Sequence, residues 1–190
     1  MLQKKDKDSI LFFNKSSFKI AKLIFNCPNK VYHIRMLERE TGLSTTAIKD
    51  AIKYFKEFEI ISIDSTTLTT NIKANLESES YRFYKFVFNI YRLKRYLFID
   101  NLIRAYNNPE AIVLFGSFAR GEDIEESDID ILIITSNEPE EYLTKLIFTF
   151  EKELNRKINI HTLPSLEKSS VEFKNNLANG IVLYGYLKVI

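Results

Sequence analysis

Apolar residues recur at spacings of three and four through most of the first hundred residues, as in helices with one buried face. This pattern predicts helices over residues 16–25, 33–40 and 44–58, and the second and third are joined by a short turn that contains Gly42. Residues 60–76 change to strand character around a polar turn at Ser65, Thr66 and Thr67. Residues 79–107 hold neither Gly nor Pro, and we expect one long helix there, straight or kinked.

The remaining residues alternate between strands and helices, which indicates an α/β fold class. An apolar run of strand length over 112–115 stops at Gly116, and a second apolar run begins with Asp128 and Asp130. Beyond it the pattern predicts a helix over 139–155 capped by Ser136 or Asn137, then a strand over 157–163, a helix over 165–179 and a strand over 180–185.

Asp128 and Asp130 are the first candidates for chemistry. Side chains two positions apart on a strand project to the same side, so the two carboxylates face one region while Ile129 and Ile131 turn toward a core. Neighbouring carboxylates repel unless a cation lies between them, and Mg²⁺ suits such a pair because it takes oxygen ligands and is usually completed by substrate phosphates. The pair therefore predicts a Mg²⁺ site, with Mn²⁺ as the other candidate ion.

The turn at Gly116 and Ser117 adds an anion site. Gly116 permits backbone conformations that other residues resist, and Ser117 offers a hydroxyl at the expected start of a helix, where free N–H groups attract anions. Together with the two aspartates, the turn predicts a nucleoside triphosphate held between backbone donors and a metal.

The residues Gly116-Ser117-Phe118-Ala119-Arg120-Gly121 are followed, after five positions, by Ser127-Asp128-Ile129-Asp130-Ile131. This pattern resembles the signature of the minimal nucleotidyltransferases of the polymerase beta superfamily, and the resemblance covers residues 110–190. It implies a mixed sheet flanked by helices, and transfer of a nucleotidyl group from an NTP, with ATP as the expected donor, to a hydroxyl. It also implies that Gly116, Ser117, Arg120 and Ser127 bind the nucleotide. Acceptors in the family include antibiotics, RNA ends and protein tyrosines, and stand-alone members often act as antitoxins that modify a partner toxin.

The chain departs from that family at Asn159. The corresponding strand usually carries a third catalytic carboxylate, which helps to hold the metal and can take the proton from the attacking hydroxyl. An amide oxygen can still bind Mg²⁺, but it adds no charge and cannot act as a base near neutral pH. His161 shares the expected face of Asn159 and is an alternative base, or else a hydrogen-bonded histidine at a strand end.

Charge divides the chain into two parts of opposite sign. Residues 1–108 hold 19 Lys and Arg against 11 Asp and Glu, a net +8, whereas residues 109–190 hold 8 against 14, a net −6. A basic part suits a polyanion such as nucleic acid. Several charges are expected to be simply solvated: Arg92, Lys94, Arg95, Arg104, Glu122, Asp123, Glu125 and Glu126.

The three helices and the strand pair resemble a winged helix-turn-helix domain of bacterial and archaeal transcription regulators. On the third helix an apolar stripe leaves polar side chains on the other face. If that face enters the major groove of double-stranded DNA, Thr45, Thr46 and Lys49 reach base edges, and Lys53, Lys56 and Lys73 contact phosphates. The alternative is that this domain docks a protein partner.

These features predict a winged helix-turn-helix domain over 1–78, a connecting and dimerisation helix over 79–108, and a nucleotidyltransferase domain over 109–190. Aromatic residues on more than one face of the connecting helix favour a homodimer. A single cysteine, Cys27, and the lack of a secretory or membrane segment fit a cytoplasmic protein. The predicted function is Mg²⁺-dependent nucleotidyl transfer. The alternative is a DNA-binding regulator whose degenerate nucleotidyltransferase domain only senses nucleotide.

Overall fold

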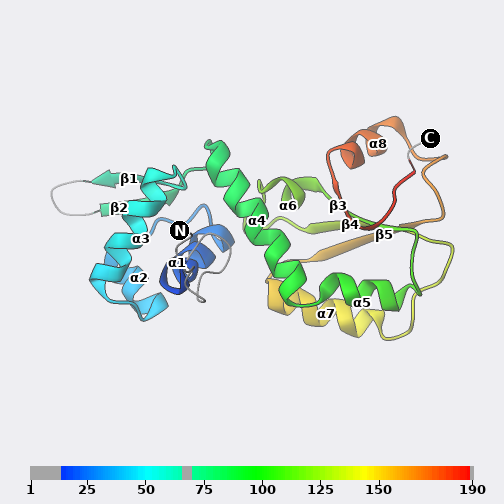
Figure 1. Cartoon of the computed structure of the whole chain (residues 1–190), viewed down its shortest axis with the longest axis horizontal. Helices are drawn as coiled ribbons and strands as arrows, with labels where there is room; N and C mark the ends of the chain where they lie inside the picture. The colour runs from blue at the N-terminus through cyan, green and yellow to red at the C-terminus, as the bar shows by residue number, and fades with distance from the viewer. Residues whose placement is uncertain (1–13, 66–69, 189–190) are drawn as a thin grey trace, which may run out of the picture. The chain divides into compact units, whose positions relative to one another are not determined.

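The computed structural model describes residues 14–65 and 70–188, and it divides the chain into two compact units, Met1–Phe88 and Asn89–Ile190 (Figure 1). The charged N-terminus, the short apolar run over residues 10–13, and the turn residues Thr66 and Thr67 lie outside the described residues. Among the helices that the structure describes, none has the length and apolar content needed to cross a membrane.

The first unit contains three helices followed by a strand pair: α1 (Lys15–Asn26), α2 (Ile34–Thr41), α3 (Thr45–Glu57), β1 (Ile61–Ser65) and β2 (Thr70–Ala74). These elements confirm the predicted bounds to within a few residues. Capping accounts for the start of α3, because the Ser44 hydroxyl accepts a hydrogen bond from the Ala47 N–H at 3.3 Å. Gly42 ends α2 with a φ of 68°, a left-handed conformation that glycine adopts at low cost.

The core of the first unit forms between the helices and one face of the strand pair. Ile48, Ala51, Ile52 and Phe55 of α3 are buried, as their spacing predicts. The strands β1 and β2 pair antiparallel with Ile63 opposite Ile72, and an isolated bridge from Tyr32 to Ile72 attaches the segment before α2 to the same strand. The opposite face of α3 is left in contact with solvent.

The prediction of one long helix over residues 79–107 was wrong. The structure has α4 (Glu79–Arg95) and α5 (Phe98–Ala105), separated by Leu97, whose φ is 56°. The break turns the apolar face of α5 onto the core of the second unit, where Phe98, Leu102 and Ala105 are fully buried. Residues 96–97 contain no helix-breaking residue, so tertiary packing, not local propensity, ends α4.

The second unit is built on a four-stranded mixed sheet in the order β5-β4-β3-β6. The strands are β3 (Ala111–Phe115), β4 (Ile129–Ile134), β5 (Ile158–Leu163) and β6 (Ile181–Gly185). The central strand β3 runs antiparallel to both β4 and β6, and β4 runs parallel to β5. This arrangement confirms the predicted mixed sheet flanked by helices.

Helices cover both faces of the sheet (Figure 1). One face packs Ile112, Leu114 and Ile131 against α5 and against α7 (Leu143–Leu154). The other face presents Val113, Phe115 and Leu132 to α8 (Val171–Ala178). Between β3 and β4 lie the one-turn helix α6 (Gly116–Arg120) and a polar loop.

Two predicted helices begin later than expected. The N-cap of α7 is Tyr142 and not Ser136 or Asn137, because the preceding segment is tied elsewhere: the Asn137 side chain donates to the Tyr106 carbonyl at 3.3 Å, and the Glu140 N–H donates to the Ala105 carbonyl. In α8 the cap is Ser170, whose hydroxyl accepts from the Phe173 N–H at 3.2 Å. The residues before Ser170 form turns.

Candidate functional site

The two aspartates of the signature lie at one end of the sheet. Asp128 directly precedes β4 and Asp130 is its second residue, and both side chains are half-buried. Parallel pairing of β4 with β5 puts Asn159 opposite Asp130. The Asn159 amide nitrogen lies 3.1 Å from Asp128 Oδ2 and 3.2 Å from Asp130 Oδ1. One amide group thus donates hydrogen bonds to both carboxylates and offsets their repulsion.

This donor set fits a divalent cation. Among the described residues no group of three or more His, Cys, Asp or Glu is placed to hold a metal ion. Beside the two carboxylates, the third polar group at this place is the Asn159 amide. The two ends of an amide are assigned from hydrogen bonding, and a half-turn of the Asn159 side chain would present its oxygen to the same place. Two carboxylates and one amide oxygen are ligands that Mg²⁺ accepts.

Gly116 lets the carboxylate of Asp130 lie directly against the backbone. Antiparallel pairing of β3 with β4 puts Phe115 opposite Asp130, so the following residue reaches the carboxylate. A Cβ atom on Gly116 would lie 2.5 Å from Asp130 Oδ2, and its φ is 75°. Ser117, in the first turn of α6, is half-buried beside it. The requirement for glycine therefore comes from both contact and backbone conformation.

Arg120 and Ser127 make their own contacts within the loop between α6 and β4. Arg120 Nε lies 2.7 Å from Glu122 Oε2 in an exposed ion pair, and the Ser127 hydroxyl accepts from the Ile124 N–H at 2.9 Å. In this structure both side chains therefore shape the loop that leads to Asp128.

His161 lies one strand repeat beyond Asn159, opposite Leu132. Its exposed ring packs between two aromatic side chains, with ring centroids 5.6 Å from Phe115 and 6.1 Å from Phe173. A separation of two strand residues, about 7 Å, puts the imidazole outside hydrogen-bonding reach of the carboxylates unless a water intervenes.

A buried ion pair supports the loop, and the prediction that Asp123 is solvated was wrong. Asp123 Oδ2 lies 3.6 Å from Arg156 Nη2, and both side chains are only 1–2% exposed. The Asn89 amide donates to Asp123 Oδ1 at 2.7 Å and to the Phe118 carbonyl at 3.0 Å. These contacts join α4, α6 and the start of β5 beneath the loop that carries Asp128.

Arg92 was also expected to be solvated and is buried instead. Its guanidinium donates to the Leu154 and Glu153 carbonyls at the end of α7. Burial, followed by the neighbouring Arg156 cation, lowers the pKa of Arg92 to about 10. No local pattern distinguishes Asp123 from the charges around it. A basic residue on a helix face that otherwise carries apolar residues was the only available signal for Arg92.

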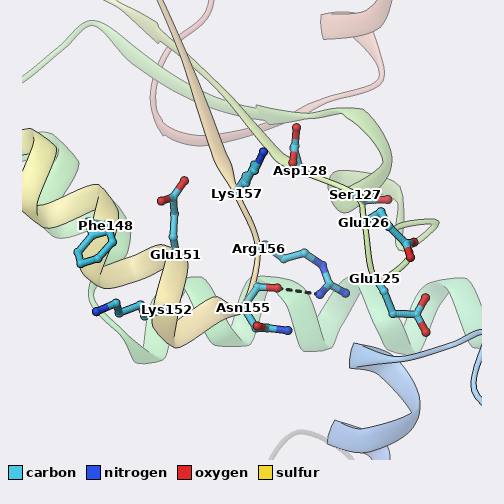
Figure 2. A pocket seen from close by; sticks show the side chains of 10 residues that line it. All are labelled: Glu125, Glu126, Ser127, Asp128, Phe148, Glu151, Lys152, Asn155, Arg156 and Lys157. Atoms are coloured by element: carbon cyan, nitrogen blue, oxygen red, sulfur yellow. Dashed lines mark hydrogen bonds between the residues drawn. The ribbon is translucent and has the colours of Figure 1, made fainter.

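A cleft of about 700 Å³ opens on one side of Asp128 (Figure 2). The loop before β4 forms one wall, the C-terminal half of α7 forms the other, and the start of β5 lies between them. The lining residues are Glu125, Glu126, Ser127, Asp128, Phe148, Glu151, Lys152, Asn155, Arg156 and Lys157.

In the first unit, the side chains predicted to contact DNA are all exposed: Thr45, Thr46, Lys49, Lys53, Lys56 and Lys73. Five of them lie on α3 and Lys73 lies on β2. The Thr45 hydroxyl donates to the Glu38 carboxylate of α2, so one of the expected base-contacting groups already has a protein partner.

Residues 98–187 match the family described as polymerase beta, nucleotidyltransferase. Two proteins of Methanocaldococcus jannaschii are similar to this chain. The one named "Putative protein adenylyltransferase MJ1379" is 45% identical over 67 residues, which are 33% of this chain and 66% of that relative. The one named "Putative protein adenylyltransferase MJ0604" is 37% identical over 91 residues, which are 46% of this chain and 91% of that relative.

Two solved structures are similar to part of this chain. A toxin-antitoxin crystallised with AMP-PNP is 23% identical, with a TM-score of 0.36, over 46% of this chain and 71% of that one. A mutant of the toxin-antitoxin MntA-HpeT is 21% identical, with a TM-score of 0.37 and the same two coverages.

Proposed function

The chain belongs to the polymerase beta nucleotidyltransferase family, and on that premise we propose that its second unit transfers AMP from ATP to a hydroxyl group of a protein. The observation that carries this proposal is the convergence of Gly116, Asp128 and Asp130 at one end of the sheet. The names of the two archaeal relatives support a protein acceptor and an adenylyl group.

The roles follow from position. Backbone N–H groups at Gly116 and Ser117 bind the terminal phosphates of ATP, because the first turn of a helix leaves such groups without helical partners. Asp128 and Asp130 hold Mg²⁺ or Mn²⁺, and Asn159 contributes its amide oxygen after a half-turn. Arg120 and Ser127 remain proposed nucleotide ligands that must first leave their contacts with Glu122 and Ile124.

The bound ion supplies charge stabilisation and orients the phosphates. The acceptor oxygen then forms a bond to the α-phosphorus, the bond between the α-phosphorus and the bridging oxygen breaks, and pyrophosphate leaves. The hydroxyl proton passes to water, because the amide of Asn159 cannot accept it. Lack of a positioned base predicts slow turnover, since general base catalysis typically contributes about 10²–10⁴-fold.

The experiment incubates the full chain with ATP labelled at the α-phosphate, Mg²⁺ and a set of candidate protein acceptors. Release of pyrophosphate together with label on a protein is the expected result. Asp128→Asn and Asp130→Asn should remove both signals. ATP binding without release of pyrophosphate, under either Mg²⁺ or Mn²⁺, would favour the second candidate, a unit that senses nucleotide without transferring it.

For the first unit we propose a winged helix-turn-helix that binds double-stranded DNA. The exposed polar face of α3 supports this function, since three lysines and two threonines lie together on it. A homodimer would match the two-fold symmetry of sites that such domains commonly read. Docking of a protein partner on the same face is the competing function.

Salt dependence separates the two functions of the first unit. Binding to a DNA pool should weaken by roughly one log unit per log unit of salt for each phosphate neutralised. Reversal of charge at Lys53 and Lys56 should lower that slope, whereas reversal at the exposed Lys145 of the second unit should leave it unchanged. Light scattering on the same samples tests the dimer. A flat salt response would exclude DNA as the ligand.

A further inference from the structure

We propose that the rings of His161 and Phe173 form the site that stacks against the purine base of the bound nucleotide. This inference rests on the proposed function and deepens it, because it assigns the part of the second unit that selects the base. His161 lies on β5 and Phe173 lies in the first turn of α8. Neither residue is among the groups proposed to hold the phosphates or the ion.

The carboxylate site and the two rings share one face of the sheet. Along β4, Ile129 packs toward α7, so the next side chain, Asp130, projects to the α8 side. The Asp128 side chain points away from the cleft beside α7 (Figure 2). On β5, Asn159 pairs with Asp130, and His161, two residues further along, projects to the same face. An ion held by the carboxylates and a ligand on the His161 ring would therefore lie on the same side of the sheet.

The helix α8 leaves part of this face open. It packs over β3, where Phe115 is only 7% exposed. Asn159 and His161 of β5 are exposed, and Phe173 is half-buried between the covered and the open part of the face. A flat ligand can therefore reach the rings from solvent without displacing the core.

Three rings form the cluster. The His161 centroid lies 5.6 Å from that of Phe115 and 6.1 Å from that of Phe173, and the two phenylalanine centroids lie 5.8 Å apart. The imidazole plane is tilted by 54° and 58° from the two phenylalanine rings, so neither of them stacks on its face. The phenylalanines instead support the imidazole before a ligand arrives, which reduces the ordering cost of binding.

The distance between the rings and the carboxylates suits the layout of a nucleotide. His161 is two residues beyond Asn159, which is about 7 Å along an extended strand. In a nucleotide one ribose separates the base from the α-phosphate, at which the proposed transfer occurs. In the proposed arrangement the terminal phosphates extend toward Gly116 and Ser117 at the end of β3, so the ribose and base extend the other way, over β4 toward β5.

Stacking on these rings favours a purine. Base–aromatic stacking uses the π face that every base has, so it does not by itself distinguish adenine from guanine. Its strength rises with the apolar area that is covered, and two fused rings cover more area than one. We therefore expect ATP and GTP to bind more tightly than CTP and UTP.

The first experiment measures the Kd of Mg²⁺-ATP and of Mg²⁺-tripolyphosphate, which carries the phosphates without ribose or base, by titration calorimetry on the full chain. His161→Ala should weaken ATP binding by about tenfold or more and leave tripolyphosphate binding unchanged. His161→Phe keeps a ring without the imidazole nitrogens and should restore the affinity for ATP. Tyr186→Ala removes an aromatic side chain that is 78% exposed elsewhere in the second unit, and should bind both ligands as the parent chain does.

A second experiment detects the base directly. The chain contains no Trp, so a single substitution gives a fluorescence signal from one known position. Titration of Mg²⁺-ATP into His161→Trp should change the indole emission, because the base stacks on the new ring, whereas tripolyphosphate should not change it. Tyr186→Trp should respond to neither ligand.

Other outcomes are distinguishable. An unchanged Kd for ATP in His161→Ala, together with transfer of AMP by the parent chain, would overturn the base site and leave the transferase intact. Equal weakening of ATP and tripolyphosphate binding would mean that the ring supports the phosphate site, and would overturn the base site as well. A loss of kcat without a change in Kd, which His161→Phe does not restore, would assign the imidazole to proton transfer instead. Lack of binding of both ligands by the parent chain would contradict the proposed function itself, and the base site with it.

Discussion

Asn159 lies directly opposite Asp130 in the parallel pairing of β5 with β4, and its amide nitrogen lies 3.2 Å from Asp130 Oδ1. The same nitrogen lies 3.1 Å from Asp128 Oδ2. In the absence of a cation, a third carboxylate at this position would face two others, whereas the amide donates to both. Asn159 therefore stabilises the ion-free site and adds no charge for an ion to bind.

Asn159→Asp should destabilise the ion-free site and strengthen the binding of a divalent ion. Without divalent ions, three neighbouring carboxylates repel, and we expect the variant to unfold at a lower temperature than the parent chain. With millimolar Mg²⁺ the additional charge should bind the ion more tightly, and the difference in unfolding temperature from the parent chain should shrink or change sign. Thermal denaturation with and without Mg²⁺ measures the unfolding temperature under both conditions. Asn175→Asp, at an exposed position of α8, is the control for an added charge elsewhere. Equal responses to Mg²⁺ in the two variants would contradict the proposal that residue 159 is a ligand of the ion.

Gly116→Ala should cost more stability than an alanine at another left-handed glycine. Gly42 has nearly the same φ, 68° against 75°, but nothing lies within 4 Å of its added Cβ. Gly42→Ala should therefore cost about 1 kcal/mol of unfolding free energy from backbone strain alone. At Gly116 the Cβ also meets Asp130 Oδ2, so we expect about 2–4 kcal/mol.

Denaturant unfolding of both glycine variants gives the comparison, and Mn²⁺ binding gives a second measurement. Gly116→Ala should weaken Mn²⁺ binding because Asp130 must move, whereas Gly42→Ala should not. Similar unfolding free energies for the two would mean that the Asp130 carboxylate moves away freely.

Tyr54 should make stability depend on pH in the alkaline range. Burial and a hydrogen bond with Tyr84 raise the pKa of Tyr54 from 10 to about 12. Below pH 10 the folded and unfolded states both hold the proton. Between about pH 10 and 12 the unfolded state loses it first, so the contribution to stability falls as pH rises. Tyr54→Phe should lessen that fall, and Tyr186→Phe, at a residue 78% exposed, should leave it as in the parent chain. Urea unfolding at pH 9 and pH 11 measures the difference.

The local spacing of apolar residues predicts most of the helices and strands of the fold. The strands β3, β4, β5 and β6 and the helices α1, α2 and α3 occur where apolar spacing predicts them, because each buries one face against a core. The glycine and the aspartates of the signature were found because their chemistry restricts residue type. The glycine and the aspartates lie close together because of the strand register, which puts both Phe115 and Asn159 opposite Asp130.

Structural features that depend on tertiary contacts could not be predicted from the sequence. The break at Leu97 has no helix-breaking residue, and the delayed start of α7 depends on bonds from Asn137 and Glu140 to residues near the end of α5. Asp123 reads as one of several acids in a polar loop. Only its approach to Arg156, 33 positions along the chain, converts it from a solvated charge to a buried one.

Asp123→Asn should therefore be far more damaging than loss of a neighbouring acid. The change leaves Arg156 buried opposite a neutral group, and breaking a buried pair typically costs about 3–5 kcal/mol, of which the remaining amide hydrogen bonds restore part. Glu122→Gln removes the exposed partner of Arg120 and should cost less than about 1 kcal/mol. Denaturant unfolding compares the two variants. Because Asp123 anchors the loop that leads to Asp128, its loss should also weaken Mn²⁺ binding under conditions where the variant is still fully folded. Normal Mn²⁺ affinity in a folded Asp123→Asn would mean that the ion pair supports the fold without positioning the site.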